Sequence, residues 1–230
     1  MKKFITPTLL ALLAVTAPVL FSNCSSESNP VSAAAASSLQ KDALDPSVIE
    51  DFPIEPLSTE EAQGLAFMRE EEKLARDVYA VLYQNWGMRI FSNISASEET
   101  HTQAVKALIL RYELTDPVVD DAAGVFADSA LSALYAQLVE AGGQSLVEAL
   151  KVGAAIEEID ILDLKHQLDE VVDNEDIAFV YGNLMRGSEN HLRAFVRTLE
   201  RQGETYTPQH LDAEDYEAIL ASTTGNGRPW

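Results

Sequence analysis

Cysteine is nearly absent from this chain. Of its 230 residues, only Cys24 carries a thiol. A single cysteine excludes a disulfide framework, and it also excludes a zinc or iron site built from four thiolates. Small domains that depend on cysteine pairs are therefore excluded as a class.

Basic residues are also scarce. The chain has 16 lysine and arginine residues against 37 aspartate and glutamate residues, which gives a net charge of -21. Such a surface repels the phosphates of nucleic acids and anionic lipid headgroups, so nucleic-acid binding is excluded. The acidity draws cations toward the protein, but charge alone does not make a binding site.

No apolar run is long enough to span a membrane comfortably. The run Leu9–Phe21 follows Lys2 and Lys3 and is shorter than the roughly 20 apolar residues of a transmembrane helix. This pattern is typical of an export signal, here residues 1–23. Cys24 comes next, and the arrangement resembles a bacterial lipoprotein signal, in which that cysteine is lipidated. We expect an exported, periplasmic or outer-surface protein of the cell envelope, anchored through Cys24; the alternative is an ordinary cleaved signal.

The rest of the chain divides into three parts. Residues 24–57 are rich in Ser, Ala, Asn and Pro without a hydrophobic period, which predicts a flexible tether. Over residues 58–222, apolar residues recur at helical spacing and no stretch alternates like a strand. This pattern predicts one all-α domain. Residues 223–230 are expected to form a loose tail.

The expected helices have recognisable starts. Ser58 with Glu61, and Ser145 with Glu148, match the capping-box pattern. The expected helices cover residues 58–85, 89–112, 130–140, 145–168, 175–202 and 212–221. Four of them are long, and a long connection holding a short helix joins the second to the third. We expect a four-helix bundle with a crossover connection, which is how ferritin-like folds are built.

An acid and a histidine fall on the apolar face of the second long helix. Glu98 and His101 lie one turn apart inside its apolar stripe. At this spacing both side chains can reach one ion, which is the Glu-x-x-His arrangement of metal sites in bundles. The alternative is a capping or solvated pair, but buried ionisable groups are costly unless they are paired or bind metal.

The third long helix repeats the pattern. Glu157 and Asp160 are three residues apart on its apolar face, and Asp163 lies near the edge of that face. Glu158 is expected to face solvent. An acidic run on a solvated helix would account for Glu158 but not for Asp160.

The fourth and first long helices add further candidates. His191 and Ser188 point inward from the fourth helix, although a lone histidine on an apolar face is often a core residue. On the first helix, the helical wheel places Glu71 near the centre of the apolar stripe and Glu72 nearer its edge. Glu70 is expected to face out. The wheel therefore favours Glu71 as the inward-facing acid.

These residues resemble the ferritin-like di-iron carboxylate superfamily, which includes rubrerythrin and bacterioferritin. Glu72, followed by Ala75 and Tyr79, is similar to the first-helix motif of that superfamily, and this favours Glu72 over Glu71. The other matching positions are Glu98 and His101, Glu157 with Asp160, and His191 followed by Phe195.

The chain resembles one uncharacterised ferritin-like family more closely, the domain of unknown function 2202. The matching segments are residues 70–79, 94–98, 153–161 and 187–192. The resemblance covers residues 58–220. It implies the fold and a di-iron centre, and it supplies no reaction.

Two departures from the superfamily affect the expected chemistry. Ser188 stands where the superfamily usually has a glutamate, and Asp160 is the candidate replacement for that acid. The chain also lacks the cysteine pairs of a rubredoxin-type domain, so redox activity would need an external electron donor. Tyr79 and Tyr112 lie on core faces. Three roles are possible for them from the sequence: packing, hydrogen bonding or a redox relay.

The resemblance and the residue pattern together give a set of metal ligands. The predicted ligands are Glu72, Glu98, His101, Glu157, Asp160 and His191. Four carboxylates and two imidazoles suit two ions of iron or manganese. We expect redox chemistry with peroxide, O₂ or Fe(II), as in a di-iron oxidoreductase of peroxidase or ferroxidase type. The alternative is a non-catalytic lipoprotein that holds metal or has a structural role.

Overall fold

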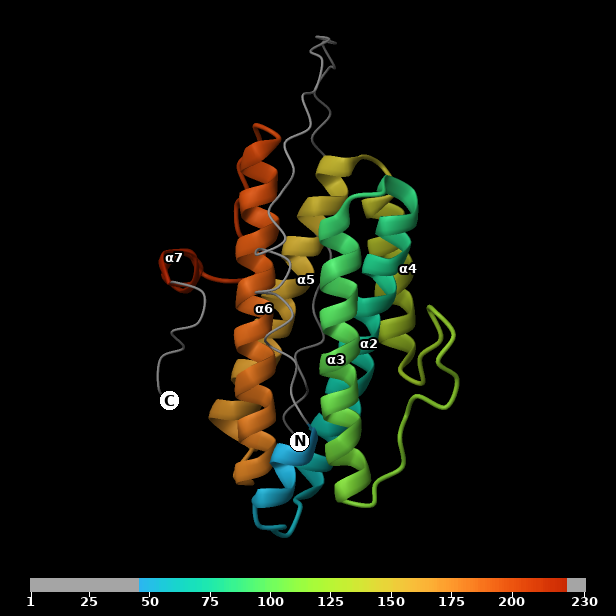
Figure 1. The fold of residues 1–230 in the computed structure, drawn as a ribbon, viewed down its shortest axis with the longest axis vertical. Coiled ribbons are helices and arrows are strands. Elements are labelled where there is room, and N and C mark those ends of the chain that lie inside the picture. The colour runs from blue at the N-terminus through green and yellow to red at the C-terminus, as the bar shows by residue number, and fades with distance from the viewer. Residues whose placement is uncertain (1–45, 223–230) are drawn as a thin grey trace. The chain divides into compact units, whose positions relative to one another are not determined.

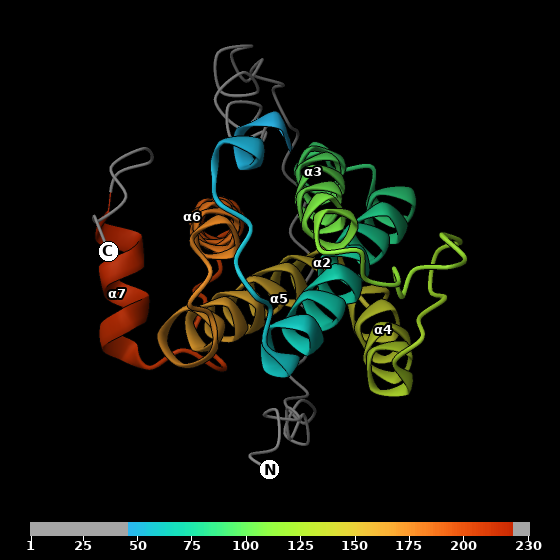
Figure 2. The ribbon, with the colours of Figure 1, turned by 90° about the horizontal axis from the view of Figure 1, so that it is seen from below.

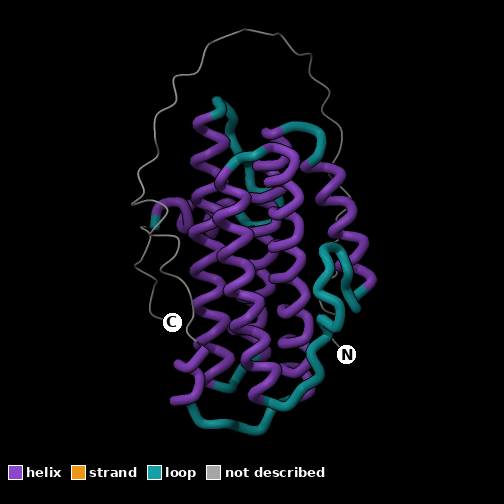
Figure 3. Tube along the Cα trace, turned by 45° about the vertical axis from the view of Figure 1, so that its right-hand side comes forward, coloured by secondary structure: helices purple, strands orange, loops and turns teal. Residues whose placement is uncertain are grey.

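The computed structural model describes residues 46–222. The predicted export signal, Cys24, the beginning of the predicted tether and the predicted tail over 223–230 lie outside the described residues. The described part is built from helices and contains no strand (Figure 3). The prediction of an all-α domain is therefore confirmed.

Each expected helix is present, with its bounds within a residue or two of those predicted. The elements are the short 3₁₀ helix η2 (Pro46–Asp51), α2 (Thr59–Trp86), α3 (Arg89–Arg111), α4 (Ser129–Gly142), α5 (Leu146–His166), the π-helical turn η3 (Gln167–Val171), α6 (Glu175–Arg201) and α7 (Ala213–Ala221).

Helix α2 begins and ends with the local structures that its sequence predicts. The Ser58 hydroxyl accepts a hydrogen bond from the Glu61 backbone N–H, and the Glu61 carboxylate accepts one from the Ser58 backbone N–H, which completes the capping box. Gly87 ends the helix at φ 62, a left-handed conformation that glycine adopts without steric cost. At α5, the Ser145 hydroxyl accepts a hydrogen bond from the Glu148 backbone N–H, but the Glu148 carboxylate pairs with Lys151, so the expected capping box is only half formed.

The long helices enclose a common interior. Helices α2, α3, α5 and α6 run side by side (Figure 1), with α2 packed on α3 and α5 packed on α6. Helix α3 also contacts α6, and α2 contacts α5. Helix α4 packs against both α2 and α5 (Figure 2), so it covers the edge between them.

An aromatic cluster fills part of this interior. The Phe195 ring of α6 lies 5.4 Å from the Tyr79 ring and 5.9 Å from the Phe91 ring, measured between centroids. Gly153 of α5 faces the same ring, and a Cβ there would lie only 2.4 Å from a Phe195 ring carbon. The missing side chain therefore lets α5 approach α6 closely.

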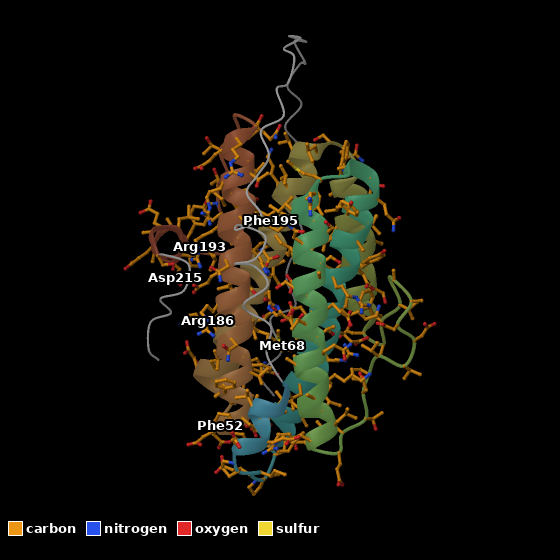
Figure 4. All side chains as sticks on the ribbon, in the orientation of Figure 1. Phe52, Met68, Arg186, Arg193, Phe195 and Asp215 are labelled. Atoms are coloured by element: carbon orange, nitrogen blue, oxygen red, sulfur yellow. The ribbon has the colours of Figure 1, made fainter. Side chains whose placement is uncertain are left out.

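The C-terminal helix α7 is attached to α6 by one arginine. Arg193 of α6 donates hydrogen bonds to the Ile219 carbonyl at 2.8 Å and to the Ser222 hydroxyl at 2.7 Å. Figure 4 shows Arg193 on the side of α6 that faces α7. This contact fixes the end of the described chain against the long helices.

Two acids that we expected to face solvent are buried instead. Glu70 accepts a hydrogen bond from the backbone N–H of Asp128 at 3.0 Å and another from Ala127. Glu158 accepts backbone hydrogen bonds from residues 209–211, at distances down to 2.6 Å. The prediction failed because a helical wheel considers only the long helices, whereas the connection before α4 and the segment before α7 cover these faces.

Part of the predicted tether is packed on the helices. Ile49 of η2 is buried, and the Phe52 ring lies 5.2 Å from the Phe179 ring of α6. The Phe52 carbonyl also accepts a hydrogen bond from Arg111 at 2.5 Å. The tether prediction is therefore wrong for this stretch, because its few apolar residues find a partner surface. No helix within residues 46–222 is long and apolar enough to cross a lipid bilayer.

Candidate metal centre

Five of the six predicted ligands meet in the interior between the long helices. Their side chains come from all four of these helices, and all are buried. They form two groups that could each hold a metal ion: Glu72, Glu98 and His101, and Glu98, Glu157 and His191. Within each group, one potential ligand atom from each residue lies within 4.8 Å of the others.

Glu98 lies between the two groups. Its Oε2 is 2.7 Å from Nδ1 of His101, and its Oε1 is 2.8 Å from Nδ1 of His191. The two imidazole rings stack with their centroids 5.6 Å apart. Each oxygen of this one carboxylate therefore faces a different half of the cluster.

Each half is completed by a further carboxylate. Glu72 Oε2 of α2 is 3.2 Å from Nδ1 of His101. On the other side, Glu157 Oε2 of α5 is 3.4 Å from Nδ1 of His191. Both histidines thus turn the same ring nitrogen toward the carboxylates.

The structure separates the two neighbouring acids of α2. Glu72 reaches the histidine and carboxylates of the cluster. Glu71 is buried too, but its carboxyl group shares a hydrogen bond with Asp163 of α5. The geometry agrees with the residue that the motif favoured, and not with the one that the helical wheel favoured.

Asp160 lies beside the cluster rather than within either group. Its Oδ2 accepts a hydrogen bond from the Ser188 hydroxyl, and its Oδ1 has no hydrogen-bond partner. Burial, followed by the charge of Glu72, raises the pKa of Asp160 well above its usual value. The Ser188 hydroxyl therefore holds the Asp160 carboxylate beside the cluster.

Outer hydrogen bonds hold one half of the cluster more firmly than the other. The Tyr79 hydroxyl donates to Glu157 Oε1 at 2.5 Å, and Nε2 of His191 lies 3.1 Å from the Ser97 hydroxyl. In contrast, Nε2 of His101 has no partner. That nitrogen packs against Gly187, where a Cβ would lie 2.6 Å away. The sequence analysis did not predict a role for Ser97. The only feature of the sequence that pointed to it is that it directly precedes Glu98.

Comparison with known proteins gives the chain its family. Residues 61–223 match the model of an uncharacterized protein domain, DUF2202. The chain belongs to the DUF2202 family. It is 54% identical over 179 residues to the uncharacterized protein MJ0754 of Methanocaldococcus jannaschii, and the match covers 78% of this chain and 96% of that protein. The crystal structure of the hypothetical protein MJ0754 superposes with a TM-score of 0.74, covering 76% of this chain and 99% of that one.

Burial and neighbouring charges shift the pKa values of the cluster in this DUF2202 protein. Burial raises the pKa of Glu72 to about 7, against the charge of His101. Burial also acts to raise the pKa of Glu98, but the charges of the two histidines outweigh it and lower that pKa. For His191, burial acts to lower the pKa, but the carboxylates, Glu98 first, raise it to about 10. The carboxylates therefore strongly favour positive charge at the centre.

The cluster contains buried polar atoms without hydrogen-bond partners. Buried polar atoms in native proteins are almost always hydrogen bonded, so each exception calls for an explanation. The atoms in and beside the cluster that lack such a partner are Glu71 Oε2, Glu72 Oε1, His101 Nε2 and Asp160 Oδ1. Glu98 Oε1 and His191 Nδ1 lie 2.8 Å apart as an ion pair without hydrogen-bond geometry. Carboxylate oxygens and imidazole nitrogens are ligands of iron, manganese and zinc. The residues present therefore fit a metal site.

The hydroxyl groups of Tyr181 and Tyr112 differ in their hydrogen bonding and in their position relative to the cluster. Tyr181 of α6 is fully buried, and its hydroxyl has no hydrogen-bond partner. Burial, followed by the charges of Glu72 and Glu71, raises its pKa well above the usual value. Tyr112 instead donates to Asp176 at 2.8 Å, outside the cluster. Tyr181 was not singled out from the sequence because an inward tyrosine on a helix is usually packing.

Proposed function

We propose that this DUF2202 protein is a ferritin-like four-helix bundle that binds two divalent ions, iron or manganese, for redox chemistry with peroxide, O₂ or Fe(II). The observation that supports the proposal is the position of Glu98, one oxygen of which faces each histidine. Helix α4 would belong to the crossover connection of such a bundle.

Each half of the cluster would hold one ion. Glu72 and His101 would bind the first, Glu157 and His191 the second, and Glu98 would bridge them. Asp160 would supply a further ligand through Oδ1, which has no hydrogen-bond partner, while its Oδ2 stays bonded to the Ser188 hydroxyl.

The charge balance of the site favours this occupancy. Each unpaired buried charge is costly, and two divalent ions match the four carboxylates while leaving the imidazoles neutral. Bound iron supplies two electrons to a two-electron oxidant such as peroxide. The chain's own contribution is to exclude bulk water, since the five clustered side chains are 1–2% exposed.

Metal analysis of protein from an iron-rich medium, together with an optical spectrum, tests the proposal. We expect bound iron in the wild type and background iron in Glu98→Ala, since that variant loses a ligand of both ions. Glu99→Ala is the matched control, because the Glu99 carboxylate binds Arg76 at 2.6 Å, outside the cluster. Wild-type protein without metal would reject the proposal and favour a structural lipoprotein. Metal that binds but never changes oxidation state would favour a non-catalytic metal-holding protein.

The cellular location is a separate part of the proposal. A lipid on Cys24 would anchor the protein to the cell envelope, and an external donor would deliver electrons. We expect Cys24→Ala to move the protein from the membrane fraction to the soluble fraction, as followed by fractionation and immunoblotting. Ser25→Ala serves as the control. Wild-type protein in the soluble fraction would exclude the lipid anchor.

A further inference from the structure

One side of the cluster lies between α2 and α5. Glu98, Glu157 and the other three clustered residues are 1–2% exposed, whereas Glu71 and Asp160 are each 6% exposed. Ile159, one residue before Asp160, is 9% exposed.

A cavity lies on this side of the cluster. Its volume is about 10 Å³, which is about the space that one water molecule requires. Its wall includes four acidic side chains, those of Glu71, Glu98, Glu157 and Asp160. Leu74, Ile156 and neighbouring aliphatic side chains line the rest of the wall from α2 and α5.

Helix α4 closes the outside of this cavity. It contributes Leu134 and Leu138 to the lining. Helix α4 packs on both α2 and α5 (Figure 2), and these two leucines line the cavity from that helix. Leu131 is buried on the same helix but does not line the cavity.

We infer that this cavity is the route by which a small uncharged molecule, of the size of dioxygen or hydrogen peroxide, reaches the carboxylate cluster, and that Leu134 and Leu138 set its size limit. The inference rests on the proposed function. Aliphatic walls disfavour charged molecules, because ions lose their hydration there. The inner carboxylates also repel anions. Size and charge together thus select small neutral molecules.

Nitric oxide is a suitable probe, because it is diatomic and uncharged and its binding to Fe(II) can be followed without turnover. The experiment measures its association rate with Fe(II)-loaded protein by stopped-flow absorbance. We expect Leu138→Ala to raise this rate several-fold and Leu138→Phe to lower it several-fold. Leu134→Phe should also lower it, which keeps the test open if Leu138→Phe does not fold.

Leu131→Ala is the matched control, since it shortens a buried leucine of the same helix away from the cavity. It should keep the wild-type rate. Equal rates in Leu138→Ala and wild type, or equal acceleration in Leu138→Ala and Leu131→Ala, would overturn the inference. The second result would mean that loosening α4 anywhere admits the probe.

A comparison of peroxides tests the size limit directly. In the wild type, hydrogen peroxide should oxidise the bound Fe(II) much faster than tert-butyl hydroperoxide does. Leu138→Ala should reduce the ratio of these two oxidation rates. An unchanged ratio would contradict the role of Leu138. Iron content is measured first in every variant. Wild-type protein that takes up no iron would reject the proposed function itself, whereas iron-loaded variants with unchanged kinetics would reject only the access route.

Discussion

At the scale of single residues, the direction of each side chain decides what the cluster can do. Glu72 and Glu71 are consecutive in the chain and both are buried. Their carboxylates nevertheless have different partners, because consecutive positions on a helix point about 100° apart. One faces His101 and the other faces Asp163.

This difference predicts unequal effects of two alanine variants. We expect Glu72→Ala to lower the bound metal more than Glu71→Ala, since only Glu72 contacts a histidine of the cluster. Metal content per chain after dialysis is the measurement. A greater loss in Glu71→Ala would show that the Glu71 pair with Asp163 rearranges to bind metal.

Ser97 provides a second test at this scale. Its hydroxyl lies 3.1 Å from Nε2 of His191, so it fixes the ring with Nδ1 toward the carboxylates. Losing such an outer partner typically weakens metal binding about 10–100-fold. In Ser97→Ala we expect the affinity for one of the two ions to fall by this factor, as measured by Mn(II) titration. Ser95→Ala is the control, because the Ser95 hydroxyl bonds the Arg76 carbonyl instead. Equal affinities in the two variants would exclude the positioning role.

At the scale of elements, one acid ties the start of α2 to the start of α6. The Glu61 carboxylate accepts hydrogen bonds from the Ser58 N–H at 2.9 Å and from the Asp173 and Asn174 N–H groups at 3.2 Å each. Burial acts to raise the Glu61 pKa, but these hydrogen bonds outweigh it and lower the pKa below 4.5. The charged form is therefore the one that holds the two helix starts together.

The lowered pKa gives a pH-dependent stability. A group whose folded-state pKa is depressed stabilises the fold above its unfolded-state pKa, and this contribution disappears as the pH falls through the folded-state pKa. We expect Glu61→Gln to destabilise the metal-free protein by about 1–3 kcal/mol at pH 7. The difference should shrink below pH 4.5, as followed by urea unfolding. Glu60→Gln, at the exposed neighbouring position, should behave like the wild type. A difference that persists in acid would contradict this assignment.

At the scale of the whole molecule, metal binding should stabilise the assembled helices. The candidate ligands come from four helices that meet only in the folded state, so ions would bind that state in preference to the unfolded chain. Free metal at a hundredfold excess over the dissociation constant would add about 2.7 kcal/mol. We therefore expect chelator to lower the melting temperature of the wild type.

The double variant Glu98→Ala and His101→Ala isolates this contribution. It should remain helical by circular dichroism and should melt at the same temperature with and without chelator. If chelator also leaves the wild-type melt unchanged, and no metal copurifies, the di-metal proposal fails.

The sequence by itself determined the helices and the candidate residues. Capping residues such as Ser58, and glycines such as Gly87, act on their immediate neighbours, so the helix bounds could be read locally. The periodicity of apolar residues likewise placed Glu98, His101 and His191 on inward faces. These features depend on one helix at a time.

Only the tertiary structure decided which atoms meet. The central place of Glu98, the contact of Ser97 with His191 and the cavity under α4 all depend on distances between helices. The burial of Glu158 depends on residues about fifty positions later in the chain. A helical wheel gives a direction relative to one helix axis. It carries no information on the neighbour that fills that direction, and packing of the whole chain supplies that neighbour.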